Sequence, residues 1–468
     1  MSAKTYGFWG GLGLFALLLV LPAPEGMPVE AWRTAALVAL MASWWMTEAL
    51  PLTATALLPF ILLPFMGVMT TNEVAGAYYS PILFLILGGA FIALAIERTG
   101  LHKRLALAII ARAGKTAWGL LLAFMTATAI LSMIVSNTST TLIMIPIAVA
   151  VLAAANVAEG ETGGFAGALV MGIAFAASIG GLGTLVGSPT NAIAAGLMER
   201  TLDIPVSFLL WASFGLPVVL AGIPLCLFIL IRVQKVARHA FDVDGAQAAI
   251  GDPGTWSGAE KRLVPVIALV VAAWIMLPFV KGLLPEGAIH DGTVAIIGGL
   301  LLFVLPDGSG RPLLNWREAN RAPWDVIMLF GGGLALASGI IASGLAAWLG
   351  EALQPLQTVN LVIIALAVTA LVVLVTEFAS NVATASGIMP VIAALIVATG
   401  ADPMYLAMPA ALAASWGFML PSGTGPNAIA WSTHHIALPR MLKSGFLLDI
   451  CGIPMIVAIT WMVATIGG

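Results

Sequence analysis

Two short polar sequences interrupt long apolar stretches and combine residue types that can bind an anion. The first tip is Ser136-Asn137-Thr138, within the apolar stretch 118–155, and the second tip is Ser380-Asn381-Val382, within the stretch 358–399. Ser and Asn are favoured N-cap residues, so each tip is expected to begin a helix whose free N–H groups point into the protein. Because such a helix end attracts negative charge, we predict anion binding at both tips. The alternative is that these hydroxyls only bond to helix carbonyls.

Two related sequences interrupt two other apolar stretches. GSPTNAIA begins at Gly187, within 165–198, and GTGPNAIA begins at Gly423, within 404–433. Gly and Pro free backbone carbonyls there, and such groups are tolerated at membrane depth only where protein, ions or water satisfy them. Carbonyl, hydroxyl and amide oxygens without a carboxylate suit a monovalent cation such as sodium. We predict a sodium site at each break, with a kink that serves only helix packing as the alternative.

The composition of the chain is that of an integral membrane protein. Of its 468 residues, 60% are hydrophobic and only 9% are charged. A soluble domain carries about 25% charged residues, so this chain could not cover a water-exposed surface. The apolar residues form many stretches of about 20, the length of a helical span, without the alternation of membrane strands. The net charge of −3 leaves no electrostatic footprint for nucleic-acid binding.

The spans predict an all-α polytopic fold of eleven transmembrane helices plus two re-entrant hairpins at 118–155 and 358–399. The eleven spans are expected at residues 7–22, 33–50, 53–68, 80–97, 165–198, 205–231, 263–280, 293–306, 326–341, 404–433 and 445–466. With the N-terminus in the cytoplasm, 16 of the 19 Lys and Arg residues fall on the cytoplasmic side, and only Arg33, Arg200 and Lys281 fall outside. This asymmetry supports the topology and places the C-terminus outside the inner (plasma) membrane.

The two halves of the chain repeat each other. The matching residues, all 244 positions apart, are Gly88-Gly89 with Gly332-Gly333, Thr99-Gly100-Leu101 with Ser343-Gly344-Leu345, Ser136-Asn137 with Ser380-Asn381, Thr140 with Thr384, and Pro146 with Pro390. The two Gly-rich sequences match at a spacing of 236. Five full spans lie between equivalent points, and an odd number of spans inverts the second copy. Inverted repeats with broken helices are typical of secondary transporters.

Enzymatic and passive functions are the rival interpretations. A membrane zinc protease would carry His-Glu-x-x-His, which this sequence lacks, and a serine hydrolase would need a His near a buried Ser. All five His residues fall in predicted loops or at span ends. We therefore predict that the protein is not an enzyme. An anion channel lined by the same tips is the more distant alternative.

These residues together resemble the divalent anion/sodium symporter family, whose members move dicarboxylates, citrate or sulfate. The resemblance rests on WWMTEALPL from Trp44, the two tips, the two Gly-rich sequences and the eleven-span plan, and it covers nearly the whole chain. It implies a homodimer in the lipid membrane and an elevator mechanism. The implied parts are a first span (1–26), repeat 1 (27–245) with scaffold 27–80 and transport part 81–232, a cytoplasmic linker (246–262), and repeat 2 (263–468) with scaffold 263–323 and transport part 324–468.

The resemblance also implies two or more bound sodium ions and a small dianionic substrate. The first sodium site would use Ser132, Ser136, Asn137 and Gly187, and the second Thr376, Ala379, Asn381 and Gly423. The substrate-binding residues would be Asn137, Thr138, Ser188, Pro189, Ser380, Asn381, Val382 and Thr424. Val382 stands where some relatives have Thr, and Gly425 where a Pro is common.

The function that the resemblance implies is sodium symport of a C4-dicarboxylate such as succinate, malate or fumarate. The alternatives within the same family are a dicarboxylate exchanger and a citrate or sulfate transporter. Val382 removes one hydroxyl donor from the second tip, so the identity of the anion stays open at the level of the sequence.

Overall fold

The computed structural model describes residues 3–158, 160–236, 242–243, 245, 250–252, 254–285 and 287–467. The predicted linker 246–262 lies partly outside the described residues, at 246–249 and 253. The same holds for residues 1–2 of the predicted first span, for 159, 237–241 and 244 of repeat 1, and for 286 and 468 of repeat 2. Helices dominate the described chain, which contains no sheet and a single isolated bridge between Pro306 and Pro312. The predicted all-α class is confirmed.

The helices follow the apolar stretches of the sequence. Their bounds are α1 (Ala3–Val20), α2 (Val29–Thr47), α3 (Leu52–Thr55), α4 (Leu58–Phe65), α5 (Thr71–Ala77), α6 (Pro81–Thr99), α7 (Leu101–Ile110), α8 (Ala117–Ser132), α9 (Asn137–Ala154), α10 (Gly164–Gly181), α11 (Pro189–Leu202), α12 (Phe208–Gln234), α14 (Gly258–Val280), α15 (Asp291–Val304), α16 (Trp316–Ala319), α17 (Trp324–Ala342), α18 (Leu345–Ala352), α19 (Leu361–Phe378), α20 (Asn381–Thr399), α21 (Met404–Ala413), α22 (Gly425–Trp431) and α23 (Leu438–Gly467). Two short 3-10 helices, η2 (Lys281–Leu283) and η3 (Gln354–Thr358), follow α14 and α18.

Each predicted span coincides with a helix or a pair of helices. In the described part of the chain, nine helices are long and apolar enough to cross a membrane, and five shorter apolar helices accompany them. The chain is therefore a multi-pass membrane protein. The exact count of eleven spans and the re-entrant path of the two hairpins stay predictions, because helix length and composition alone do not place a helix relative to a bilayer.

The predicted span 53–68 is divided into α3 and α4 by a turn at Ala56 and Leu57. The Tyr78 hydroxyl donates to the Ala56 carbonyl over 2.7 Å. α17 approaches the same carbonyl so closely that a Cβ atom at Gly332 would lie 2.2 Å from the Ala56 oxygen. These contacts come from distant parts of the chain and accompany a local cause, because Pro59 in the first turn of α4 lacks the N–H that would continue α3.

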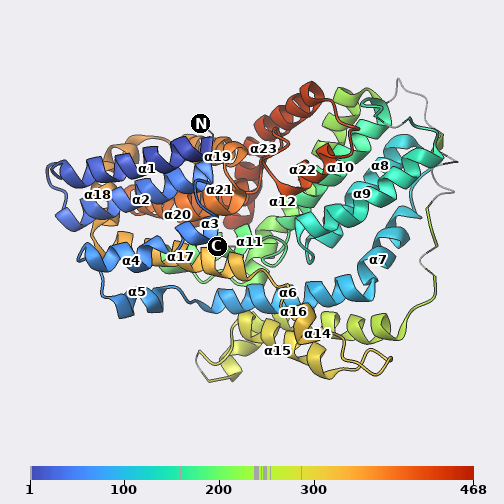
Figure 1. Ribbon diagram of the computed structural model, residues 1–468, viewed down its shortest axis with the longest axis horizontal. Coiled ribbons are helices and arrows are strands. Elements are labelled where there is room, and N and C mark those ends of the chain that lie inside the picture. Colours follow the sequence, from blue (N-terminus) through green and yellow to red (C-terminus); the bar gives the residue numbers. More distant parts are fainter. Residues whose placement is uncertain are drawn as a thin grey trace.

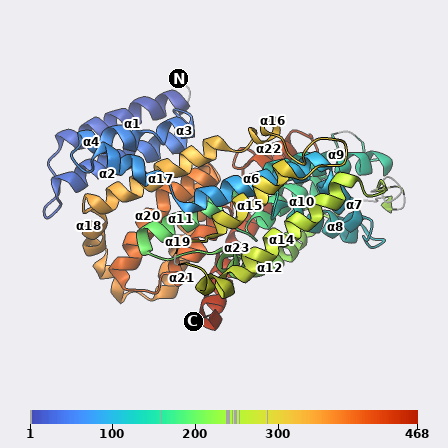
Figure 2. The ribbon, with the colours of Figure 1, turned by 90° about the horizontal axis from the view of Figure 1, so that it is seen from below.

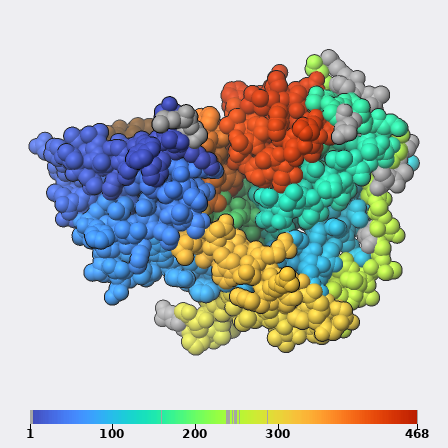
Figure 3. All heavy atoms as spheres, in the orientation of Figure 1, coloured from blue at the N-terminus to red at the C-terminus, as the bar shows by residue number. Residues whose placement is uncertain are grey.

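The elements form two packed regions linked by long helices. In Figure 1, α1, α2, α4, α5 and α18 lie at one end, while α7 to α10 lie at the other. α6 runs between these ends, next to α15 and α14, and Figure 2 shows the same arrangement from below. A smaller apolar cluster holds side chains from α2, α4, α5 and α17, and a larger one fills the rest of the protein. In the space-filling view, α23 covers the face between the two ends (Figure 3).

The two polar tips and the two Gly-rich sequences are helix breaks, as predicted. α8 and α9 flank the first tip, and α19 and α20 flank the second. α10 and α11 flank the first Gly-rich break, and α21 and α22 flank the second. The packing is crossed, because α9 contacts α22 and α20 contacts α11. Each tip helix therefore packs against a broken helix of the other half of the chain.

Candidate functional site

The two tips begin their helices as N-caps. The Ser136 hydroxyl accepts a hydrogen bond from the Ser139 N–H at 3.2 Å, and the Ser380 hydroxyl accepts one from the Ala383 N–H at 3.2 Å. Each cap leaves other first-turn N–H groups without an intrahelical partner, because a helix has four such donors at its start. The predicted capping is confirmed, and both helices present a positive end at the tips.

A cluster of oxygens surrounds the first predicted sodium site. The Ser132 hydroxyl donates to the Ala177 carbonyl over 2.7 Å and lies 2.7 Å from the amide of Asn137. With the opposite orientation of the amide, the side-chain nitrogen of Asn137 would donate to the Gly187 carbonyl at 3.3 Å and to the Ala177 carbonyl at 3.2 Å. Ser136, the remaining predicted ligand, is exposed and pairs with the Ser139 hydroxyl at 3.0 Å. Three of the four predicted residues are thus brought together.

The second predicted sodium site repeats this pattern. The Thr376 hydroxyl donates to the Ala414 carbonyl over 2.7 Å and lies 2.9 Å from the amide oxygen of Asn381. Ala379, which directly precedes the second tip, is buried. A Cβ atom added to Gly423 would lie 3.3 Å from the Leu420 carbonyl oxygen. Neutral oxygens in a buried setting fit a monovalent hard cation, so the residues present at both sites suit sodium.

Close backbone approach explains the glycine of the first break. A Cβ atom at Gly187 would lie 2.6 Å from the Gly181 carbonyl oxygen and 3.0 Å from the Ser132 carbonyl oxygen. Only glycine therefore lets several carbonyl oxygens converge here. The Thr184 hydroxyl donates to the Met133 carbonyl and accepts from the Gly187 N–H at 3.0 Å, which ties the break to the first tip.

A buried carboxylate organises the second break. Glu377 is 4% exposed and accepts hydrogen bonds from the N–H groups of Phe418, Met419 and Leu420, the last two at 2.9 and 3.2 Å. Glu377 lies three residues before Ser380, where a carboxylate can either shape the nearby cation site or belong to a separate hydrogen-bond network. Its contacts hold the loop that leads to Gly423, so Glu377 sets the course of the backbone next to the second site.

Two asparagines that the sequence did not single out brace the breaks from inside. Asn191 donates to the Gly181 and Thr184 carbonyls at 2.7 and 2.8 Å, and Asn427 donates to the Leu420 carbonyl at 3.0 Å. Both are 0% exposed, and the oxygen of each amide has no hydrogen-bond partner among the described residues. They occupy the same place in the two NAIA sequences, a match that could have identified them.

The predicted substrate residues lie at the starts of four helices. Ser188 and Thr424 are the residues that precede α11 and α22, and Pro189 stands in the first turn of α11. The first tip meets the second break directly, because a Cβ atom at Gly425 would lie 2.6 Å from the Thr138 hydroxyl. Gly425, where a Pro is common in the resembling family, thus leaves room for Thr138. Val382 is half-buried and packs against both apolar clusters.

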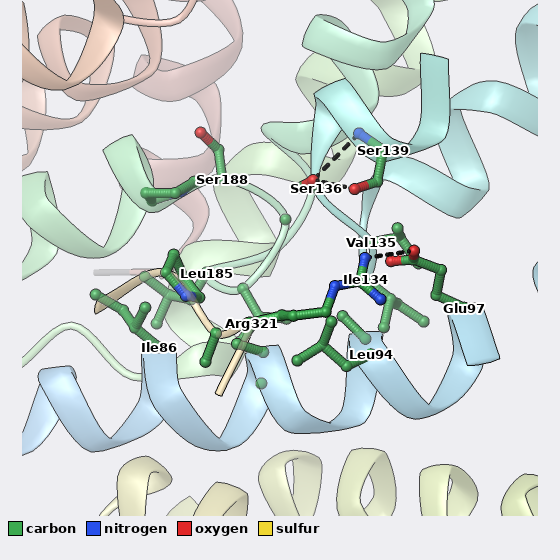
Figure 4. A pocket seen from close by; sticks show the side chains of 18 residues that line it. Ile86, Leu94, Glu97, Ile134, Val135, Ser136, Ser139, Leu185, Ser188 and Arg321 are labelled. Atoms are coloured by element: carbon green, nitrogen blue, oxygen red, sulfur yellow. Dashed lines mark hydrogen bonds and ion pairs between the residues drawn. The ribbon is translucent and has the colours of Figure 1, made fainter. Parts of the chain in front are cut away.

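The tips open into two separate pockets. The first-tip pocket includes Ser136, Gly187, Ser188 and Pro189 (Figure 4). The second-tip pocket includes Ala379, Ser380 and Gly423, with Glu377 and Glu48 beside them. The structure therefore divides seven of the predicted site residues between two pockets. The others line neither pocket: Ser132, Asn137, Thr138, Thr376, Asn381, Val382 and Thr424.

Ion pairs lie near α6 and α16, and one of them, between Arg321 and Glu97, lines the first-tip pocket. Arg98 pairs with Asp307, Arg311 pairs with Glu318 at 2.7 Å, and Arg321 pairs with Glu97 at 2.9 Å. The hydrogen bonds from Ser309 to Asp307, together with the charge of Arg98, lower the pKa of Asp307 to about 2. Asp307 is thus a fixed negative charge at neutral pH, and it holds Arg98 in place.

Similar proteins are found in bacteria. A sodium-dependent dicarboxylate transporter SdcS from Staphylococcus saprophyticus is 39% identical over 462 residues, which cover 96% of this chain and 89% of the relative. One from Staphylococcus aureus strain RF122 is also 39% identical, over 481 residues that cover 99% of this chain and 92% of the relative. Both relatives are named as transporters, in agreement with the prediction that this protein is not an enzyme.

The fold also resembles a solved membrane transporter. The crystal structure of the YdaH transporter from Alcanivorax borkumensis superimposes with a TM-score of 0.54 at 16% identity and covers 98% of each chain. At this identity the likeness concerns the fold alone. The family described as the sodium:sulfate symporter transmembrane region matches residues 9–466 of this chain. With nearly the whole chain matched, and the tips and breaks in the expected places, the protein belongs to the sodium:sulfate symporter family.

Proposed function

We propose that the protein is a secondary active transporter that moves a C4-dicarboxylate, such as succinate, malate or fumarate, together with sodium ions. The observation that carries the proposal is the repeated arrangement of Ser132 and Asn137 in one half and Thr376 and Asn381 in the other. Each arrangement joins buried neutral oxygens to the start of a tip helix. A cation and an anion can therefore bind side by side at each tip.

Charge compensation gives the physical reason for coupling. A dianion in a dry site needs positive charge, and Arg321 is the one Lys or Arg residue among the described lining residues of the two tip pockets. Two sodium ions together with the helix N-termini would supply that charge. Sodium binding would then raise the affinity for the anion, and the anion would raise the affinity for sodium by the same factor.

The names of the relatives favour dicarboxylate as the anion. The SdcS relatives are named as sodium-dependent dicarboxylate transporters, and the identity of 39% extends over nearly the full chain.

We propose that the protein works as a homodimer by an elevator movement. In this mechanism the parts 81–232 and 324–468 would carry the site past the scaffold parts 27–80 and 263–323. The N-terminus would lie in the cytoplasm and the C-terminus outside the plasma membrane.

Uptake into proteoliposomes tests this function. Labelled succinate should accumulate when an inward sodium gradient is applied and should not accumulate when choline replaces sodium. Vesicles loaded with unlabelled succinate test the exchanger alternative. Uptake that requires internal succinate and ignores the sodium gradient would identify an exchanger. Competition by citrate, sulfate or unlabelled succinate, each added in excess at the same concentration, would show whether either of the first two is preferred to the C4-dicarboxylate.

A further inference from the structure

The first-tip pocket contains one ion pair whose two partners come from different predicted parts of the protein. The Arg321 guanidinium donates to the Glu97 carboxylate over 2.9 Å. Glu97 lies near the end of α6, in the predicted transport part, and Arg321 lies between α16 and α17, in the predicted scaffold. Figure 4 shows Arg321 and Glu97 meeting on one side of the pocket, with Ser136 and Ser139 on the other side.

Arg321 can supply the positive charge that a bound dianion requires. Of the described residues that line the first-tip pocket, only Glu97 and Arg321 are charged. The second-tip pocket contains two carboxylates, Glu48 and Glu377, and its described lining has no Lys or Arg. Arg stays charged at all relevant pH values and binds a carboxylate through two parallel hydrogen bonds. Among the described lining residues of the two pockets, Arg321 is therefore the one that carries a positive charge, while Lys4 pairs with Glu48 at 3.3 Å without lining the second pocket.

Arg98, another arginine of this region, is already held by several partners. Arg98 donates to Asp307 and to the Pro312 and Leu313 carbonyls, and it also approaches Glu318. Arg321 has a single hydrogen bond to Glu97, and its side chain is 64% exposed. An exposed ion pair of this kind contributes little, so an incoming carboxylate can replace Glu97 at small cost.

We propose that Arg321 is a substrate-recognition residue at the mouth of the first-tip pocket. It exchanges Glu97 for one carboxylate of the dianion while the other carboxylate lies between the N–H groups of the first tip and the predicted substrate residues of the second tip. This inference rests on the proposed function, because it takes a dicarboxylate as the substrate. Glu97 acts as a competitor that occupies Arg321 in the absence of the anion. Arg321 would also favour a dianion over a monoanion.

Substitution of Arg321 and of Glu97 should change the Kd of succinate in opposite directions, which distinguishes substrate recognition from a purely structural role. If the pair only joins α6 to the α16–α17 connection, removing either charge should weaken succinate binding alike. If Arg321 binds substrate, Arg321→Gln should raise the Kd of succinate by about tenfold, the effect of one lost charge-assisted hydrogen bond. Glu97→Gln should lower it by about twofold to threefold, because a weak competing pair is removed.

The experiment is calorimetric titration of the purified full-length protein at saturating sodium. Wild type, Arg321→Gln, Arg321→Lys, Glu97→Gln and the control Arg317→Gln are each titrated with succinate and with monomethyl succinate. Arg317 is an exposed arginine of α16 that does not line the pocket, so its loss removes a nearby charge without touching the site. The preference for succinate over the monoester should shrink in Arg321→Gln, persist in part in Arg321→Lys, and stay unchanged in Arg317→Gln.

Each remaining outcome counts against the proposal. Equal weakening in Arg321→Gln and Glu97→Gln would show a structural tie, and an equal effect in Arg317→Gln would show a general field effect. If Arg321→Gln does not fold, Glu97→Gln and Arg321→Lys still decide, since tighter binding in Glu97→Gln is required. Wild type that binds no succinate would overturn the proposed substrate class, whereas wild type that binds succinate with unchanged variants would overturn only the role of Arg321.

Discussion

Ser132 and Thr376 stand 244 positions apart and make the same pair of hydrogen bonds. Each hydroxyl donates to the carbonyl of an alanine in or beside a neighbouring helix, Ala177 or Ala414, over 2.7 Å. Each also contacts the asparagine of its own tip, at 2.7 and 2.9 Å. The same chemistry is thus built twice, once in each half of the chain, at the places where sodium is proposed to bind.

Sodium should stabilise the protein against heat. If both oxygen clusters bind sodium in the folded state only, the free energy of unfolding rises with sodium concentration by mass action, by about 2.7 kcal/mol per site at a hundred times the dissociation constant. The melting temperature in detergent should increase in sodium chloride and stay unchanged in choline chloride at equal ionic strength. Equal stabilisation by the two salts would count against a specific sodium site.

Removal of either tip amide should abolish transport. Asn137→Ala and Asn381→Ala each delete a group that is proposed to serve a cation and the substrate together. Sodium-driven uptake of succinate should fall to the background of empty vesicles, while expression and size-exclusion profile stay like those of the wild type. Full transport by both variants would disprove the site assignment, and loss of the folded protein would indicate that the amides serve structure.

Glu377→Gln should weaken the second sodium site through its loop. The carboxylate accepts three backbone N–H groups, and a Gln side chain offers only one oxygen, so a buried donor loses its acceptor at a cost of about 1 to 3 kcal/mol. We expect a lower melting temperature and a higher sodium concentration for half-maximal stabilisation. The matched control is Glu351→Gln, which changes an exposed glutamate of α18. An unaltered sodium dependence in Glu377→Gln would show that the loop does not control the cation site.

Val382→Thr should change the ranking of substrates. The second tip lacks the hydroxyl that Thr138 gives the first, and Thr is nearly isosteric with Val. A donor left unpaired in a dry site costs about 1 to 3 kcal/mol, so anions that satisfy it gain relative to those that do not. Competition of succinate, citrate and sulfate against the best labelled substrate measures the ranking. An unchanged ranking with unchanged affinity would mean that position 382 faces the apolar clusters against which it packs, and not the substrate.

Local patterns predicted the helices and the breaks of this fold, because apolar length, N-cap residues and Gly-Pro pairs act over a few residues. The helix ends at Ser136, Ser380, Ser188 and Thr424 were predictable in this way. The break at Ala56 was not predicted, although Pro59 gives a local signal for it; Tyr78 and Gly332 contact its carbonyl from elsewhere in the chain.

Parts of the site also depend on contacts between distant residues. The backbone hydrogen bonds that Glu377 accepts come from residues more than 40 positions away. The sequence around Arg321 is that of an ordinary basic loop and does not indicate a binding site. Only the three-dimensional structure places Arg321 in the first-tip pocket. The sequence could therefore identify which residues have suitable chemistry at the tips, while their division between two pockets required the structure.

The most direct measurement of the central idea is the ratio of sodium to dicarboxylate that enters together. Proteoliposomes containing the wild-type protein are given labelled sodium and labelled succinate, and both initial rates are counted in the same vesicles. Two oxygen clusters, each with one sodium ion, predict that at least two sodium ions enter with each succinate and that neither ion accumulates without the other. Succinate uptake with no accompanying sodium would contradict the account.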